Sequence, residues 1–195
     1  MLIGLLLGPW LVACATDPSL PVEYGVPDAC WVDSTFRWID PMAEKAGWPN
    51  LREQPPEHQA GDEVRVWIGF ALRPWQAVRM ARGPQGATVE RFGGMYPLHS
   101  VNDADGDAAV RSESEHVAES LWRDFDRLDI ATLPDGRLLN DPTVRDGVSY
   151  LFEVYQDGRY RALKYSNPDA SRAWQARRVQ RFIRSLEDHL GLEGL

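Results

Sequence analysis

Cysteine is scarce in this chain: only Cys14 and Cys30 occur among 195 residues. Two cysteines exclude a small domain that is held together by several disulfides. Positive charge is also in deficit, because 21 lysines and arginines face 29 aspartates and glutamates, and the formal net charge is −8. A nucleic-acid-binding protein needs positive charge to neutralise phosphates, so we expect no nucleic-acid partner.

Long apolar runs and catalytic motifs are absent as well. No uncharged run reaches the ~20 residues that a membrane-spanning helix needs. The chain contains no H-E-x-x-H, G-x-S-x-G or C-x-x-C motif and no glycine-rich phosphate loop. Its four histidines do not stand at metal-ligand spacing. The sequence therefore favours a protein without catalytic activity, cofactor or metal.

One acidic loop contains residues of the type that bind calcium. Asp103, Asp105 and Asp107 lie close together, and clustered carboxylates suit a cation that prefers six to eight oxygen ligands. The complete loop motif, counted from Asp103, needs a glycine and a glutamate where Ala108 and Ser114 stand. We expect a solvated acidic loop, with calcium binding as the alternative.

The amino-terminal residues carry the clearest signal of location. Residues 1–13 have no charged side chain and include a compact apolar run, which suits the core of a secretory signal. The run ends in Leu11-Val12-Ala13-Cys14, which resembles the lipobox of bacterial lipoproteins. The resemblance implies that residues 1–13 are a signal peptide and that Cys14 becomes the lipid-modified first residue of the mature chain. Because Ala15 rather than aspartate follows, it also implies an outer-membrane anchor facing the periplasm.

A second interpretation of this segment stays open. Secretory signals begin with lysine or arginine, and neither precedes the apolar run here. The segment would then be a buried helix or strand, and Cys14 would be free to form a disulfide with Cys30 in an oxidising compartment. Otherwise we expect Cys30 to be a buried, inert thiol, because no histidine stands near it to activate it.

We expect a tether at residues 14–61 and a globular domain at 62–195. Seven prolines punctuate the tether, so a single long helix is not predicted there, although residues 42–46 suit one helical turn. Its middle contains apolar side chains that we expect to dock onto the globular domain. These are Trp31, Phe36, Trp38, Ile39 and Trp48.

Alternating apolar and polar residues predict strands in the globular domain. Residues 62–72 alternate with period two, which indicates one buried face. Residues 77–92 break at a Gly-Pro-Gln-Gly turn, which favours two strands, with a short helix at 74–80 as the alternative. At 147–165 the Asp157-Gly158 pair predicts a hairpin in which Tyr155 faces Tyr160, with one face in the core and the other half exposed.

Two helices complete the predicted fold. Apolar residues recur at helical spacing over 112–130, where Ser112 is the expected cap, and over 167–191, where Asn167 is the expected cap and Gly191 the end. We predict an α+β domain with an antiparallel sheet of about five strands and both helices on one face. The expected order is βββαββα.

Two surfaces are candidates for interaction. Arg177, Arg181 and Arg184 share one face of the second helix, which is either solvated and partly self-paired or meets an anionic partner, a protein or lipid phosphates. Trp67, Tyr155 and Tyr160 lie opposite the predicted core and form an exposed aromatic patch unless the tether or the second helix covers them.

The sequence therefore favours a membrane-tethered periplasmic protein that binds rather than catalyses. Its expected partners are the bilayer, through acylated Cys14, and a protein. An envelope accessory or an immunity-type protein fits this description. The alternative is a periplasmic hydrolase whose site is assembled from scattered residues, such as His99 with nearby carboxylates.

Overall fold

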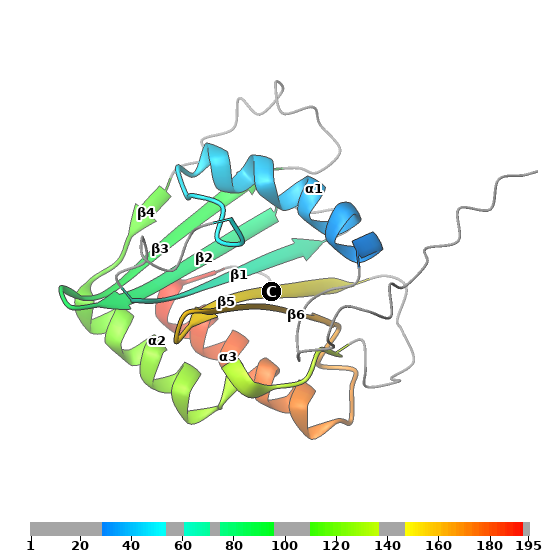
Figure 1. The fold of residues 1–195 in the computed structure, drawn as a ribbon. Helices are drawn as coiled ribbons and strands as arrows, with labels where there is room; N and C mark the ends of the chain where they lie inside the picture. The colour runs from blue at the N-terminus through cyan, green and yellow to red at the C-terminus, as the bar shows by residue number, and fades with distance from the viewer. Residues whose placement is uncertain (1–28, 54–60, 71–74, 96–109, 137–146, 193–195) are drawn as a thin grey trace, which may run out of the picture.

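The computed structural model describes residues 29–53, 61–70, 75–95, 110–136 and 147–192. Within them, a six-stranded antiparallel sheet carries helices on both faces (Figure 1). The strands are β1 (Asp62–Phe70), β2 (Trp75–Gly83), β3 (Gly86–Met95), β4 (Val110–Ser112), β5 (Val148–Gln156) and β6 (Arg159–Ser166). The helices are α1 (Ala29–Lys45), α2 (Glu115–Arg127) and α3 (Trp174–Leu190), with a short 3-10 helix, η2 (Ile130–Thr132). The predicted α+β class with an antiparallel sheet is confirmed.

The predicted element order is wrong at two places. α1 precedes the first strand, and β4 is a sixth strand between β3 and α2. In space the strands follow the order β4-β3-β2-β1-β5-β6, so β1 is central and pairs with both β2 and β5. The central strand therefore joins two hairpins into one sheet.

Both hairpins form as predicted. β2 and β3 meet at the Gly-Pro-Gln-Gly turn, so the alternative helix at residues 74–80 is wrong. β5 and β6 pair with Tyr155 opposite Tyr160 and Phe152 opposite Leu163. Asp157 and Gly158 have φ of 52° and 73°, as expected for a two-residue hairpin loop whose backbone is left-handed at both positions.

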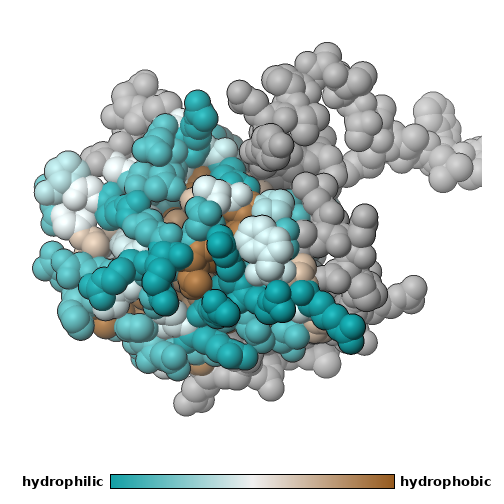
Figure 2. Space-filling model, turned by 90° about the horizontal axis from the view of Figure 1, so that it is seen from below, coloured by the Kyte–Doolittle hydropathy of each residue, from teal (hydrophilic) through white to brown (hydrophobic). Residues whose placement is uncertain are grey.

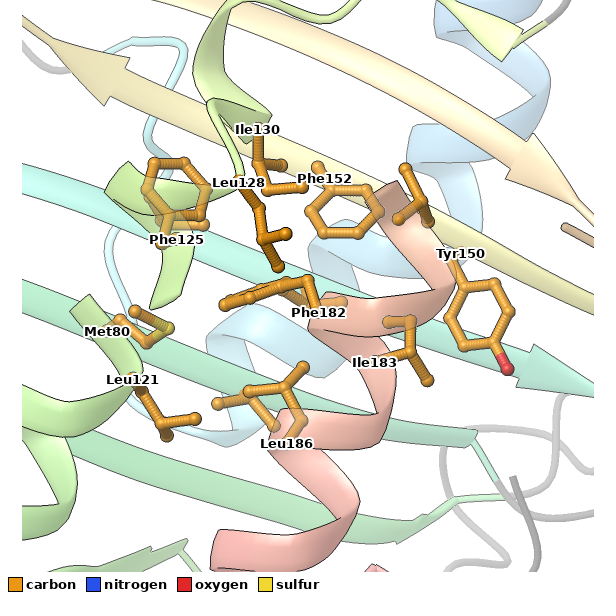
Figure 3. Close-up of a cluster of buried hydrophobic side chains, with 14 of the residues drawn as sticks. Met80, Leu121, Phe125, Leu128, Ile130, Tyr150, Phe152, Phe182, Ile183 and Leu186 are labelled. Atoms are coloured by element: carbon orange, nitrogen blue, oxygen red, sulfur yellow. The ribbon is translucent and has the colours of Figure 1, made fainter. Parts of the chain in front are cut away.

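The larger core lies between the sheet and the pair α2 and α3. Figure 3 shows Phe182 of α3 between Phe125 of α2 and Phe152 of β5. The ring centroids of Phe125 and Phe152 lie 5.5 and 6.2 Å from that of Phe182, a spacing at which aromatic pairs attract each other. All three side chains are at most 1% exposed. This is the face that the apolar alternation of the strands predicted.

The predicted helix starts are wrong, and side-chain hydrogen bonds explain why. Ser112 lies in β4, and α2 is capped instead by Ser114, whose Oγ accepts a hydrogen bond from the Val117 backbone N–H at 3.4 Å. Asn167 caps no helix: its Oδ1 accepts from the Val148 N–H at 2.9 Å and closes the end of the β5–β6 pair. α3 therefore begins only at Trp174, whereas Gly191 ends it as predicted, with φ of 59°.

A second core lies on the opposite face, beneath α1 (Figure 1). The prediction of only one helical turn in this segment, at residues 42–46, is wrong, because α1 has 17 residues and contains Pro41. The predicted docking is confirmed for Phe36, Ile39 and Trp48, which are at most 3% exposed. It is wrong for Trp38, which is 50% exposed. Because of α1, both faces of the central sheet are buried.

Candidate functional site

A row of charged residues crosses the sheet on the face that α1 covers. The strand register places Glu90 of β3 opposite Arg79 of β2, Arg79 opposite Arg65 of β1, and Arg65 opposite Glu153 of β5. Glu63 lies two residues before Arg65 and therefore on the same face. We call these five residues the charged row. Arg65 and Glu153 are 1% and 3% exposed.

Glu63 holds the two arginines of the charged row together. Its Oε1 accepts hydrogen bonds from Nε of Arg65 at 2.7 Å and Nε of Arg79 at 2.9 Å, and its Oε2 accepts from Nη2 of Arg79 at 2.9 Å. Arg79 also donates to Glu90 through Nη1 at 3.1 Å. Burial alone raises the pKa of Glu63, but the hydrogen bonds from Arg79 and the charge of Arg65 outweigh it, so the pKa is lowered.

Glu153 has different partners from Glu63. Its Oε2 accepts from the indole Nε1 of Trp67 at 2.7 Å, and its Oε1 accepts from the Tyr160 hydroxyl at 2.9 Å. Both donors are neutral, and no cation among the described residues lies within ion-pair distance of this carboxyl. Burial raises the pKa of Glu153, and the opposing charge of Arg65 does not cancel that effect. The carboxyl therefore favours its protonated form more than an exposed glutamate does.

A cavity of about 330 Å³ opens between α1, the segment after it and the sheet. We call it the α1 cavity. Its volume lies at the lower end of the range for small-molecule sites. Its polar and aromatic lining comes from α1, from the segment that follows and from the two central strands. These residues are Asp40, Glu44, Trp48, Asn50, Arg65 and Glu153.

The expected aromatic patch is not exposed. Trp67 is fully buried and Tyr155 is 5% exposed, because α1 and Trp48 cover this face. The rings of Trp48 and Trp67 lie 5.7 Å apart. Tyr160 is half-buried and donates its hydroxyl hydrogen bond to Glu153. Trp67 and Tyr155 therefore form no exposed recognition surface, and the alternative, that the tether covers this face, is confirmed.

The charged row was not predicted from the sequence, because this face of the strands was expected to be half exposed. Charged residues that alternate with apolar ones in a strand usually face water, and Arg65 and Glu153 fit that pattern. One signal pointed the other way: Trp67 and Leu151 share the face of the charged row and lie opposite each other. Large apolar side chains on a supposedly solvated face indicate that something covers it.

The three predicted arginines lie together on the surface of α3. Arg177, Arg181 and Arg184 are exposed, and they make no ion pair with any residue in the described part of the chain. Trp174, three residues before Arg177, is 50% exposed. Trp174, Arg177, Arg181 and Arg184 thus form one line at helical spacing, which we call the α3 stripe.

The neighbourhood of the α3 stripe is mostly hydrophilic. Arg178 places its guanidinium 4.7 Å from the centroid of the Trp174 ring and lies 3.5 Å from Asp129. Figure 2 shows the face below the sheet as largely hydrophilic, with hydrophobic areas only in small gaps. On such a face a half-exposed tryptophan is unusual, and it marks one end of the stripe.

Several predicted features lie outside the described residues. These are the lipobox with Cys14, the side chain of Cys30, His99 and the loop with Asp103, Asp105 and Asp107. Among the residues that are described, no three histidine, cysteine, aspartate or glutamate side chains come together as a metal site. None of the described helices has the length and apolar character needed to cross a membrane.

Comparison with known proteins does not assign the chain to a family. The chain matches no protein-family model, and it matches no curated protein.

Proposed function

We propose that this chain is a membrane-tethered, non-catalytic binding protein of the bacterial periplasm. The tether rests on the resemblance of Leu11-Val12-Ala13-Cys14 to a lipobox. Acyl chains on Cys14 would hold the chain at the outer membrane, because each buried methylene contributes ~0.8 kcal/mol and more than one chain makes the anchor firm. The globular domain would then face the periplasm and meet its partner there.

The α3 stripe is the observation that carries the binding function. Tryptophan and arginine are the residues most enriched at binding hot spots, because each combines a large contact area with directed hydrogen bonds. Trp174, Arg177 and Arg181 stand exposed in one line. Seven of the thirteen other arginines in the described residues are held by carboxylates.

An acidic protein surface is the partner that suits the stripe. The chain as a whole carries a net charge of −8, so a local run of three exposed arginines would orient an acidic partner toward α3, while the acidic remainder of the surface would repel it. Charges at an interface act mainly by steering the encounter and fixing its orientation. Such a partner fits either an envelope assembly or a secreted toxin that the protein neutralises.

Site-specific cross-linking in intact cells tests this proposal. A photoreactive residue at position 180, beside the stripe, should capture a partner, and Arg181→Glu should reduce that capture strongly. Arg123→Glu is the matched control, because Arg123 is exposed on α2 and the charge change is the same. Equal capture in the wild type and the Arg181→Glu variant would show that the stripe is merely solvated.

A second function, hydrolysis in the same compartment, has one observation in its favour. Glu153 is a buried carboxyl with a raised pKa and lines the α1 cavity, which is the environment of a general acid. If it acts so, turnover of an ester or glycoside substrate should be lost in Glu153→Gln. Hydrolysis that persists in that variant would remove Glu153 as the acid.

A further inference from the structure

We propose that the α1 cavity binds an organic cation, a primary ammonium or a guanidinium group, which pairs with the carboxylate of Glu153. The site is distinct from the α3 stripe, which lies on the other side of the sheet. The ligand site proposed here is therefore independent of the binding function proposed for that stripe.

The charge balance around the cavity favours a cation. Arg65 and Arg79 carry two positive charges, and Glu63 and Glu90 balance them through direct ion pairs. The guanidinium of Arg52, beyond the cavity lining, is likewise paired with Asp40. Ionised Glu153 is then left as a buried charge whose hydrogen bonds, among the described residues, come from the neutral groups of Trp67 and Tyr160. A buried charge is costly unless it is paired, so a cation beside Glu153 would relieve that cost.

The remaining lining of the cavity also suits a cation. Glu44 of α1 adds an exposed carboxylate to the lining, and negative charge lining a cleft raises the local concentration of cations. Trp48 contributes an indole ring, whose centroid already lies 5.9 Å from the guanidinium carbon of Arg65, because the face of an indole attracts guanidinium and ammonium groups. Aromatic and carboxylate groups together are a common lining for organic cations.

An anion fits the cavity less well. Arg65 is the one basic residue among those that line it, and its guanidinium is ion-paired with Glu63, although its Nη2 makes no hydrogen bond there. Nε donates to Glu63 Oε1 at 2.7 Å, and Nη2 lies 2.6 Å from the same oxygen. An anionic ligand would have to compete with Glu63 while lying beside the carboxylates of Glu44 and Glu153, which is unfavourable.

The volume limits the size of the group that enters. About 330 Å³ accommodates a short alkyl chain with one charged end. That chemistry occurs in free amines and in the lysine or arginine side chain of another protein. The two sources can be separated by comparing a free alkylammonium with the same group attached to a peptide backbone.

The test is an NMR titration of the tryptophan indole signals in the full globular chain. n-Butylammonium should shift the Trp67 indole signal in a saturable manner, because that N–H is bonded to Glu153. Its uncharged counterpart 1-butanol and its anionic counterpart pentanoate should bind about tenfold more weakly or worse. Nα-acetyl-lysine amide represents the protein-borne source, with its side-chain-acetylated form as the uncharged control.

Substitutions of two glutamates test whether binding of the cation depends on the carboxylates of the α1 cavity. Glu153→Gln should abolish saturable binding of the cation, and Glu44→Gln, an exposed substitution that does not threaten folding, should weaken it. Glu119→Gln on the exposed face of α2 is the matched control and should change nothing. Binding of n-butylammonium or of Nα-acetyl-lysine amide that depends on Glu44 and Glu153 supports the proposal and identifies the source. Equal affinity for 1-butanol, stronger binding of pentanoate, or no saturable shift with either cation would overturn it.

Discussion

Arg65 and Glu153 lie directly opposite each other on neighbouring strands, yet each takes different partners. Arg65 donates to Glu63 on its own strand, at 2.7 Å. Glu153 accepts hydrogen bonds from Trp67 and Tyr160 instead. The two buried glutamates near Arg65 are therefore in opposite electrostatic situations: the pKa of one is lowered and that of the other is raised. This difference leads to two predictions about stability.

The first prediction is that Glu63→Gln strongly destabilises the fold. Glutamine can still accept a hydrogen bond, but Arg65 would keep its charge at 1% exposure without its ion-pair partner. Breaking a buried ion pair in this way typically costs about 3–5 kcal/mol. Chemical denaturation should show this loss in the free energy of unfolding.

Asp129→Asn is the matched control for that substitution. Asp129 pairs with Arg178 at 3.5 Å, but the two side chains are 54% and 37% exposed. Asparagine tolerates the left-handed backbone that Asp129 adopts, with φ of 53°. The loss should stay below about 1 kcal/mol, as for other surface pairs. Similar losses in both variants would mean that burial does not strengthen the Glu63 pairs.

The second prediction concerns the pH dependence that Glu153 creates. Its pKa lies above the ordinary value of 4.5 in the folded chain, so the unfolded chain loses the proton first as the pH rises. Between pH 4.5 and the raised pKa, the free energy of unfolding should therefore fall with rising pH. Glu63 acts in the opposite sense, because its lowered pKa makes the fold lose stability as the pH drops below 4.5.

Denaturation of the wild type and of Glu153→Gln over this pH range isolates the effect. Arg65 of β1, Tyr160 of β6, Arg52, and Asp40 and Glu44 of α1 surround Glu153 and are present in both proteins, so the difference reports on Glu153. The variant should gain stability relative to the wild type as the pH rises above 4.5. A difference that stays constant would contradict the raised pKa.

The third prediction tests whether α1 is an integral part of the fold. Ile39 is 1% exposed beneath α1, whereas its neighbour Trp38 is 50% exposed. Ile39→Ala should cost about 2–5 kcal/mol, because it leaves a cavity in the second core. Trp38→Ala should change the free energy of unfolding by about 0.5 kcal/mol or less. If α1 were only a loose tether, both variants would unfold like the wild type.

Local signals explain what the sequence alone could predict. The β5–β6 register follows from Asp157-Gly158 and from alternation within the hairpin, and both are short-range features. The same holds for the apolar stripe of α3 and for its end at Gly191. These features depend on residues close in sequence, so no knowledge of the tertiary structure was needed.

The missed features depend on a long-range contact. Alternation in β1 identifies two faces but does not say what covers the second, and the cover comes from α1. Pro41 counted against a helix there, yet the apolar residues Phe36, Ile39 and Ala43 lie on one helical face and bury it against the sheet. Packing of that face outweighs the local cost of the proline. The charged row and the α1 cavity exist only because of this contact.

The last prediction concerns the tether. If Cys14 carries acyl chains, Cys14→Ala should move the protein from the membrane fraction to the soluble fraction of the cell, because each lost methylene removes ~0.8 kcal/mol of membrane affinity. Cys30→Ala is the matched control and should remain with the membrane. Mass measurement of the wild-type chain should show loss of residues 1–13 and the added mass of the lipid. A Cys14→Ala variant that stays in the membrane fraction, or a wild-type chain that retains its first residues and a bare thiol, would exclude the lipoprotein interpretation.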